Sequence, residues 1–196
     1  MDDVDSLKET FPSLKIICPR LRYWGGSTVK YGKEEGSFQV MGEVPSIVEL
    51  EPVVINSGRY INDRDIEKKR KVVVIGQSVA NQLYEGLDPI GTHLDINGVF
   101  YLVVGVFDFD TIGGDKRSRS EMVVLPISTM QKSYNMLNRI GWFSAKLQDG
   151  VDAGFLEEKV KSFLKERHTI NPDDKRAIGS WNSKKEFDSL QGLFTG

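Results

Sequence analysis

One serine lies where a catalytic nucleophile is often found, at the end of an apolar run. The segment VVVIGQSVA, residues 72–80, has the pattern of a buried strand, a Gly-x-Ser turn and the start of a helix. This order imitates the G-x-S-x-G nucleophile elbow, in which a sharp turn exposes a serine hydroxyl. The fifth position of the motif is Ala80 instead of glycine. A helix N-cap explains Ser78 without any reaction, since a capping hydroxyl stabilises a helix by about 1 kcal/mol, and we favour the cap.

The partners that a catalytic serine needs also occur in the chain. Asp108 or Asp110 and then His168 follow Ser78 in the order Ser, Asp, His that one class of serine hydrolases uses. However, the repeated strand–helix alternation of those enzymes and their glycine-rich oxyanion loop are not visible in the sequence. A small serine hydrolase using Ser78 is therefore kept only as the alternative from another functional class.

One polar loop partly matches a calcium-binding loop. The spacing Asp108-x-Asp110-x-Ile112-Gly113 supplies the first two aspartates and the glycine of such a loop. Ile112 stands where an oxygen ligand belongs, and Arg119 stands where the bidentate glutamate belongs. Two wrong ligands argue against calcium.

Other ligand sites have still less support. The chain has two histidines, His93 and His168, and it has no C-x-x-C or H-E-x-x-H motif. The glycines at 25–26 and the Gly32-Lys33 pair lack the spacing of a phosphate-binding loop. His93 has the setting of an ordinary surface histidine. We therefore predict no catalytic, cofactor-binding or metal-binding residues and no cofactor.

The single cysteine and the three tryptophans are expected to serve packing. Cys18 lies in the apolar run LKIIC, where a lone thiol usually packs as a small hydrophobic side chain. Trp24, Trp142 and Trp181 are scattered along the chain, so we expect them in the core or at its boundary.

Composition excludes several classes of protein. The 196 residues are 39% apolar and 28% charged, with a net charge of −2, which is typical of a globular domain. The basic run 68–71 directly follows Asp63, Asp65 and Glu67, so it predicts a solvated helix face and no nucleic-acid site. The N-terminus has no signal-peptide pattern, and no run approaches the roughly 18 apolar residues of a membrane span. As given, the chain is expected to be soluble, although it could be a fragment of a membrane protein.

Periodicity and turn residues predict an α+β fold. Asn97-Gly98 predicts a type I′ hairpin turn, because both residues tolerate positive φ. The polar segment 108–121 is expected to be an exposed loop. The expected helices are 2–11, one within 61–70 capped by Asn62 or Asp63, 78–85, one capped by Ser128, 153–167 and one within 183–194. The helix after Ser128 is expected to have Met130, Tyr134 and Leu137 on one face. The helix 153–167 is expected to bury one apolar stripe, made of Phe155, Leu156, Val160, Phe163 and Leu164. The expected strands are 14–23, a hairpin of 28–31 with 37–42, then 50–55, 72–75, 92–96, 99–107, 122–125 and 141–147.

Four segments in order resemble the extracytoplasmic domain of MacB/FtsX-type ABC transporter permeases. They span about residues 58–130. The segments are Gly58-Arg59-Tyr60 with INDRDIEKKRK, then VVVIGQSVANQLY, then DPIG with ING and FYLVVGVF, and then MVVLPISTMQ. The flanking segments fit the layout of that family more loosely.

The resemblance implies a two-lobed module over residues 1–196. Residues 1–50 and 131–196 would form a porter-like α/β lobe, and residues 51–130 an inserted β-rich lobe of the kind called sabre-like. The 108–121 loop would be part of an exposed tip. The resemblance also implies a place on the periplasmic side of the inner membrane, with transmembrane helices flanking the domain.

The function implied is mechanical and not catalytic. A separate cytoplasmic nucleotide-binding subunit or domain would hydrolyse ATP, and the domain would transmit the resulting motion to export of a substrate, by efflux or lipoprotein release. The partners implied are a second or paired permease copy and the ATPase, with a periplasmic adaptor and an outer-membrane duct in the case of a MacB-like exporter; nucleic acid is not among them. A free-standing soluble binding module that shares only the fold is a further alternative.

Overall fold

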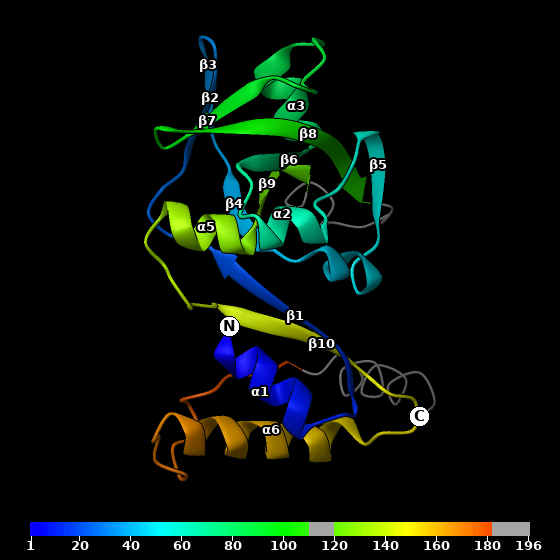
Figure 1. Cartoon of the computed structure of the whole chain (residues 1–196), viewed down its shortest axis with the longest axis vertical. Coiled ribbons are helices and arrows are strands. Elements are labelled where there is room, and N and C mark those ends of the chain that lie inside the picture. The colour runs from blue at the N-terminus through cyan, green and yellow to red at the C-terminus, as the bar shows by residue number, and fades with distance from the viewer. Residues whose placement is uncertain (110–119, 182–196) are drawn as a thin grey trace, which may run out of the picture. The chain divides into compact units, whose positions relative to one another are not determined.

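The computed structural model describes residues 1–109 and 120–181 and shows a mixed α/β fold (Figure 1). The helices are α1 Asp2–Thr10, the 3₁₀ helix η1 Pro45–Glu49, α2 Asp63–Glu67, α3 Gln77–Tyr84, α5 Ile127–Ser133 and α6 Ala153–Arg167. The strands are β1 Leu14–Arg22, β2 Thr28–Tyr31, β3 Glu34–Ser37, β4 Gln39–Glu43, β5 Val53–Gly58, β6 Val72–Gly76, β7 His93–Ile96, β8 Val99–Phe109, β9 Met122–Pro126 and β10 Trp142–Leu147. The expected fold class is confirmed. The predicted helix within 183–194 lies outside the described residues, as does most of the 108–121 loop.

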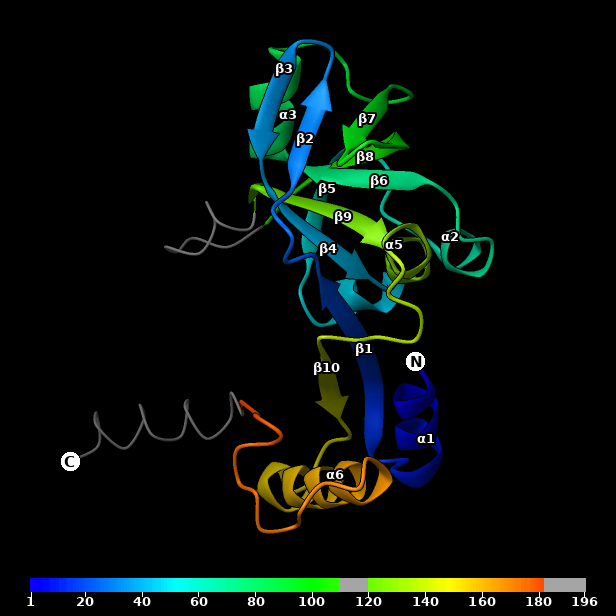
Figure 2. The same ribbon diagram turned by 90° about the vertical axis from the view of Figure 1, so that its left-hand side faces the viewer.

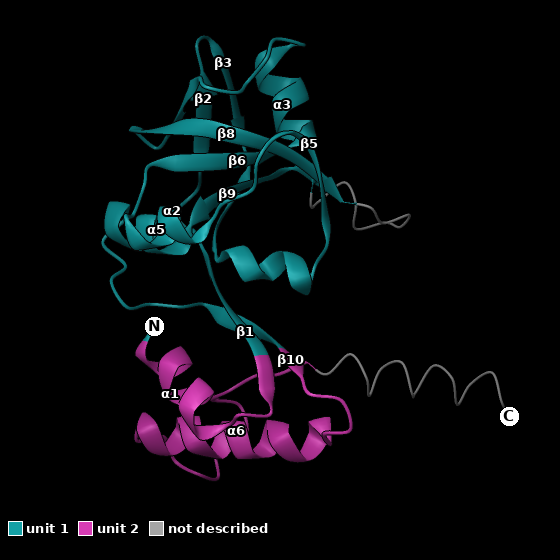
Figure 3. Cartoon of the chain, turned by 45° about the vertical axis from the view of Figure 1, so that its right-hand side comes forward, with its two compact units in different colours: residues 1, 16–145 teal, residues 2–15, 146–196 magenta. Residues whose placement is uncertain are grey.

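The chain divides into two compact units (Figure 3). Unit 1 comprises residue 1 and residues 16–145, and unit 2 comprises residues 2–15 and 146–196. These units are a partition by compactness, which does not test the predicted porter-like and sabre-like lobes. The lobe boundaries at residues 50 and 130 therefore stay a prediction.

A mixed sheet organises unit 1 (Figure 2). Its strand order is β10-β1-β4-β9-β6-β8-β7-β2-β3, and β5 pairs with β8. The pairs β4/β9 and β6/β8 are parallel, whereas β6/β9, β7/β8 and β5/β8 are antiparallel. Parallel pairs need crossover connections, and here these carry the helices that cover the sheet.

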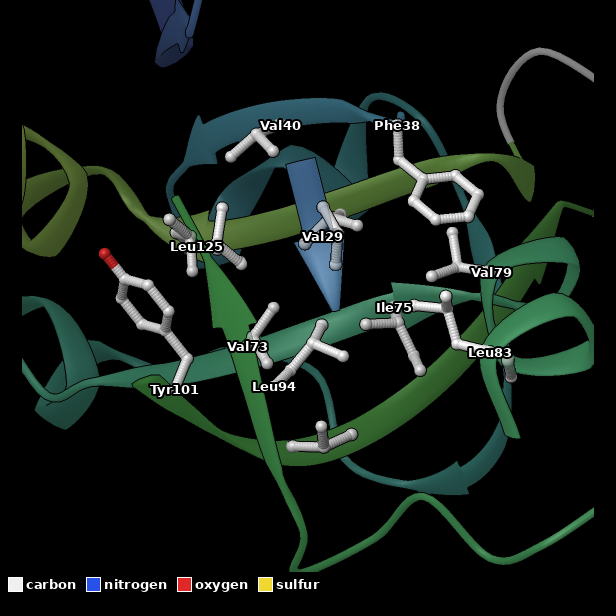
Figure 4. Close-up of a cluster of buried hydrophobic side chains, with 14 of the residues drawn as sticks. Val29, Phe38, Val40, Val73, Ile75, Val79, Leu83, Leu94, Tyr101 and Leu125 are labelled. Carbon is white, nitrogen blue, oxygen red and sulfur yellow. The ribbon is translucent and has the colours of Figure 1, made fainter. Parts of the chain in front are cut away.

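The core of unit 1 lies around β6 and β9, whose residues are all buried. Val79 and Leu83 of α3 point toward Ile75 of β6 and close one side of the cluster (Figure 4). Fully burying one such side chain stabilises a fold by about 1.5–3 kcal/mol. The run of four β-branched residues at 72–75 thus predicts this central strand correctly.

The β7–β8 hairpin confirms the predicted turn. Asn97 has φ 51° and Gly98 has φ 83°, the two positive values that a type I′ turn requires. The Gly98 N–H donates to Asp95 Oδ1 at 2.6 Å, and Ile96 pairs with Val99 directly beyond the turn.

The predicted hairpin of residues 28–31 with 37–42 is only half right. The strand that forms the hairpin with β2 is β3, joined to it through Gly32-Lys33, with Tyr31 opposite Glu34. The chain then enters β4, which pairs in parallel with β9. The polar sequence EEGS hides β3, because glutamate and glycine are poor strand formers and only the pairing with β2 orders them.

Helix α5 begins at Ile127, two residues before the start expected from a Ser128 cap, and Ser128 does not cap it. Pro126 is its N-cap and makes no side-chain capping bond, while Ser128 Oγ donates to the carbonyl of Ile66 at 2.6 Å. The helix ends at Ser133, so the expected apolar face does not extend to Leu137, which is exposed.

Unit 2 contains α1 and α6. The bounds predicted for α6, residues 153–167, are confirmed, with Leu156, Val160 and Leu164 buried on one face. Phe11 and Phe163 pack edge to face with ring centroids 5.5 Å apart. The prediction that Phe155 belongs to the buried stripe is wrong. Phe155 is 65% exposed, and the Lys159 ammonium lies 5.4 Å from its ring centroid.

Candidate functional site

The serine singled out in the sequence lies inside a helix and not on an exposed turn. Helix α3 begins at Gln77, so Ser78 is its second residue, and Ser78 is absent from the residues with positive φ. Its hydroxyl lies 2.7 Å from Ser120 Oγ. The strained elbow that exposes a nucleophile is therefore not formed here.

The predicted N-cap role of Ser78 is wrong as well. The N-cap is Gly76, and no side chain bonds to the free N–H groups at this end. The reason is a close approach: a Cβ on Gly76 would lie 2.1 Å from the carbonyl oxygen of Ser120. Only glycine fits at the junction of β6 and α3, and the Ser78 hydroxyl bonds to Ser120 instead of capping the helix.

The other candidates for a catalytic set make different contacts. His168 ends α6, and its Nε2 lies 3.0 Å from Asp3 Oδ2. Asp108 Oδ1 accepts a hydrogen bond from the Phe109 N–H at 2.8 Å. His93 is exposed on β7.

The remaining calcium-loop positions cannot be placed. Asp110, Ile112, Gly113 and Arg119 lie outside the described residues. Within residues 1–109 and 120–181, no three His, Cys, Asp or Glu side chains are grouped as metal ligands would be. The prediction of no catalytic, cofactor or metal residues stays a prediction.

The densest polar arrangement in unit 1 is a buried charged cluster that the sequence did not reveal. We define the Arg20 cluster as Arg20, Glu43, Glu51 and Tyr60. Arg20 Nη2 donates to Glu43 Oε1, and Arg20 Nη1 donates to Glu51 Oε1 at 2.6 Å. The Tyr60 hydroxyl donates to Glu43 Oε2 at 2.8 Å. The side chains of Arg20 and Glu43 are only 11% and 3% exposed.

Four separate segments supply the Arg20 cluster. Arg20 comes from β1, Glu43 from the end of β4, Glu51 from the residues after η1, and Tyr60 from the residues after β5. The cluster lines a cavity of about 10 Å³, room for about one water molecule. Arg20 Nε is buried without a partner among the described residues.

Electrostatics favour the charged form of Arg20 and the neutral form of Tyr60. Burial by itself lowers the pKa of Arg20, but the negative charges and hydrogen bonds of Glu43 and Glu51 outweigh burial and raise that pKa. Burial raises the pKa of Tyr60 well above its ordinary value, and the charge of Glu43 adds to the effect. Tyr60 thus stays a hydrogen-bond donor throughout the physiological range.

The cluster is built to join segments and not to react. Its donors and acceptors mainly satisfy one another, and its cavity has no room for a substrate. The sequence carried one weak signal for it: Arg20 and Glu43 lie beside apolar residues in the strands LKIICPRLR and QVMGE. A charge within a buried strand needs a partner, although the sequence does not say which.

A second buried carboxylate confirms the predicted cap of α2. Asp65 is fully buried, and Arg59 donates to it twice, at 2.6 and 3.2 Å. Asn62 Oδ1 accepts from the Asp65 N–H, and Asp65 Oδ2 accepts from the Asn62 N–H, which completes a capping box. This pair fixes the turn between β5 and α2.

The packing expected for Cys18 is confirmed, whereas that expected for two tryptophans is wrong. Cys18 is fully buried, and its Sγ lies 3.3 Å from Ser46 Oγ. Trp24 and Trp181 are 73% and 76% exposed, so neither belongs to the core or its boundary. Trp142 is 38% exposed, and the Arg20 guanidinium lies 5.7 Å from its ring centroid.

None of the helices in the described part of the chain is both long enough and apolar enough to cross a membrane.

Comparison with known proteins gives a consistent result. The family model of the MacB-like periplasmic core domain matches residues 1–163. The macrolide export ATP-binding/permease protein MacB of Bdellovibrio bacteriovorus is 23% identical over 170 residues, 87% of this chain and 26% of that protein. The pyoverdine export ATP-binding/permease protein PvdT of Pseudomonas savastanoi pv. phaseolicola is 27% identical over 177 residues, 88% of this chain and 26% of that protein. The chain thus spans about a quarter of the length of these curated relatives.

A solved structure shows the same fold. The periplasmic region of MacB from Actinobacillus actinomycetemcomitans matches with a TM-score of 0.80 at 18% identity, over 97% of this chain and 81% of that one. The resemblance seen in the four sequence segments is confirmed, because the family model covers most of the chain and the fold agrees with it. This chain belongs to the family of MacB-like periplasmic core domains.

Proposed function

We propose that this chain is the extracytoplasmic domain of an ABC transporter permease and has no catalysis of its own. A separate cytoplasmic nucleotide-binding subunit or domain hydrolyses ATP, and the domain transmits the motion to a substrate outside the membrane. The observation that carries this proposal is the family match over residues 1–163. The two relatives above are named as export proteins with ATP-binding and permease parts, which fits such a division of labour.

The Arg20 cluster suits a domain that must move as a rigid body. It ties β1 to the end of β4 and to the segments after η1 and β5. Apolar side chains of similar volume often stabilise a protein as well as a buried ion pair does. The hydrogen bonds of one guanidinium also fix the orientation of the segments that it joins, because its planar set of N–H groups can donate to carboxylates in only a few geometries. A strand held in this way passes a displacement on instead of absorbing it.

The setting that follows is the periplasmic side of the inner membrane. The partners would be a second or paired permease copy and the cytoplasmic ATPase, with a periplasmic adaptor and an outer-membrane duct in an efflux assembly. Efflux is one outcome of the motion and lipoprotein release is another. The names of the two relatives, for a macrolide and for pyoverdine, favour efflux.

The parent gene provides the first test. We expect it to encode one hydrophobic span before this segment and three after it. A gene encoding no hydrophobic span on either side would overturn the proposal and favour a free-standing soluble binding module.

A transport assay tests the mechanical role. The full transporter is purified into lipid discs, and ATP hydrolysis is measured beside export in cells that carry the same variants. We expect replacement of residues 16–145 by a short flexible linker to leave ATP hydrolysis in place and to abolish export. Export at the original level without unit 1 would contradict a transmitting role.

Covalent labelling of a nucleophilic serine distinguishes the serine hydrolase alternative from the non-catalytic proposal. A fluorophosphonate probe is added to the chain, to Ser78→Ala and to Ser128→Ala, a matched change of another serine near a helix start. We expect no labelling of any of the three. Labelling of the wild type and of Ser128→Ala but not of Ser78→Ala would establish a nucleophile and overturn the non-catalytic assignment.

A further inference from the structure

Trp24 lies exposed in the connection between β1 and β2, with 73% of its surface open to solvent. Tryptophan is large and apolar, and exposing it forfeits the stabilisation that burial would give. Tryptophan and arginine are also the residues most enriched where protein partners bind tightly. An exposed tryptophan beside an arginine therefore calls for a functional explanation.

The connection that carries Trp24 is held on both sides. The Tyr23 N–H donates to the carbonyl of Val40 at 3.1 Å, and the Tyr23 ring packs on Tyr134 with centroids 4.7 Å apart. On the other side, Ser27 Oγ donates to the carbonyl of Phe38. Trp24 is thus displayed by an ordered loop, so a partner would pay little of the entropy of ordering it.

The space next to Trp24 is also fixed. A Cβ on Gly25 would lie 2.8 Å from the hydroxyl oxygen of Tyr23, so a larger residue there would displace the ring that anchors the loop. Gly25 therefore keeps the Tyr23 ring in place, and the Tyr23 ring holds the loop that exposes Trp24.

Arg22 supplies the charge of this surface. Its guanidinium carbon lies 4.5 Å from the centroid of the Trp24 ring. In the part of the chain that the structure describes, no carboxylate forms an ion pair with Arg22. Arg20, two residues earlier on the same strand, bonds two carboxylates. A stacked guanidinium keeps its N–H edge available for a carboxylate.

We propose that Trp24 and Arg22 form a docking surface for an acidic segment of a partner protein. A carboxylate of that segment pairs with the open edge of Arg22, and an apolar side chain next to it covers the Trp24 ring. The charge complementarity comes from a guanidinium that lies on the Trp24 ring and forms no ion pair among the residues that the structure describes. The proposal stands on this geometry alone and does not depend on the role in transport.

An anionic membrane surface would offer negative charge too, but it fits less well. Attraction to such a surface grows with the number of basic residues that face it. Here one arginine and one tryptophan act in a chain with a net charge of −2. One arginine and one tryptophan are enough to bind a single carboxylate and a neighbouring apolar side chain of a peptide.

The test starts from a display library of random dodecapeptides. The library is selected on the immobilised chain and counter-selected on a Trp24→Ala/Arg22→Gln double variant. We expect the enriched peptides to carry aspartate or glutamate beside an apolar residue. Enriched peptides without acidic residues, or peptides that bind the double variant equally well, would overturn the proposal.

Binding is then measured with the strongest selected peptide by the fluorescence of Trp24. The protein for this step carries Trp142→Phe and Trp181→Phe, so that one tryptophan reports. We expect Arg22→Gln to weaken binding about tenfold or more, as loss of a hot-spot residue does. The matched control is Lys30→Gln, which removes an exposed cation of β2 that pairs with Glu35, and we expect no change in affinity. Equal affinity of Arg22→Gln and the parent protein would contradict the proposed role of the charge.

Two further measurements complete the test. Because both side chains are partly or largely exposed, the variants are expected to melt within a few degrees of the parent, which excludes unfolding as the cause. Vesicles of phosphatidylglycerol are added in place of the peptide. A shift of Trp24 emission with vesicles but with no selected peptide would assign the surface to lipid and refute the protein partner.

Discussion

Arg20 and Glu43 lie opposite each other on antiparallel strands and form an ion pair inside the protein. The register of β1 and β4 pairs Leu21 with Gly42, which places Arg20 across from Glu43. Both side chains are almost completely buried. Glu51 takes the second arm of the guanidinium, so one cation holds two carboxylates from different segments.

Removing the cation should destabilise the protein strongly. In Arg20→Met, Glu43 is left buried without its positive partner, and a broken buried pair costs about 3–5 kcal/mol. The free energy of unfolding, obtained from urea titration followed by circular dichroism, measures this loss. The triple variant Arg20→Met/Glu43→Gln/Glu51→Gln removes all three charges and should recover most of the loss.

The matched control is Arg139→Met, an exposed arginine in the segment before β10. Exposed substitutions usually change stability by no more than about 0.5 kcal/mol. If Arg20→Met cost no more than Arg139→Met, the cluster would not support the structure of unit 1.

Gly76 should tolerate no side chain. In Gly76→Ala the new Cβ would lie 2.1 Å from the carbonyl oxygen of Ser120, and a backbone atom cannot yield as a side-chain end can. We expect a loss of about 3 kcal/mol, the upper part of the range for overpacking. Thermal unfolding of Gly76→Ala and of Gly179→Ala checks this, since Gly179 has open space around it and no positive φ. Similar melting temperatures for the two variants would contradict the close approach.

Local features of this fold could be predicted because short stretches of sequence determine them. The Asn97-Gly98 turn depends on two φ angles, and the bounds of α6 follow from apolar spacing within fifteen residues. Asn62, one of the two residues expected to cap α2, caps it through a bond from the Asp65 N–H, three residues further on. Each of these was correct, since the residues that decide it are neighbours.

The site could not be predicted, because its partners are far apart in the chain. Arg20 bonds residues 23 and 31 positions away, and Ser78 bonds Ser120, 42 positions away. Nothing in the local sequence distinguishes Glu43 as a partner of Arg20 from any other glutamate. Ser78 was misread for the same reason, since local rules favour an N-cap and only the approach of Ser120 gives its hydroxyl another partner.

The split of β3 from β4 shows how tertiary pairing overrides local preference. Residues 34–37 have a poor strand sequence, yet they form a strand because β2 offers a complete set of backbone partners. β4 is ordered by a different neighbour, β9, which lies more than 80 residues further along the chain.

The cap of α2 should contribute a measurable part of stability. Asn62→Ala removes the acceptor for the Asp65 N–H and should cost about 1 kcal/mol, the usual value for an N-cap. Asn56→Ala serves as the control, because its hydrogen bond to Gln77 is exposed and should contribute little. Urea titration of both variants gives the comparison. Equal midpoints would show that the capping box does not stabilise the turn into α2.

The contacts of Asp3 predict how part of the stability of unit 2 depends on pH. Burial by itself raises the pKa of Asp3, but the hydrogen bonds from Arg167 and His168 outweigh it, so the pKa lies below its ordinary value. A lowered pKa means that the ionised form stabilises the fold above the unfolded pKa of about 3.9 and that this contribution disappears as pH falls through the folded value.

Asp3→Asn should therefore be less stable than the parent at pH 7, by less than about 1 kcal/mol for a partly exposed pair, and the gap should close in acid. Unfolding free energies at several pH values from 7 down to 3 measure the gap, with Asp5→Asn as the control from the same first turn of α1. A gap that stays constant down to pH 3, or one of the same size for Asp5→Asn, would mean that the bonds to Arg167 and His168 are not what Asp3 contributes.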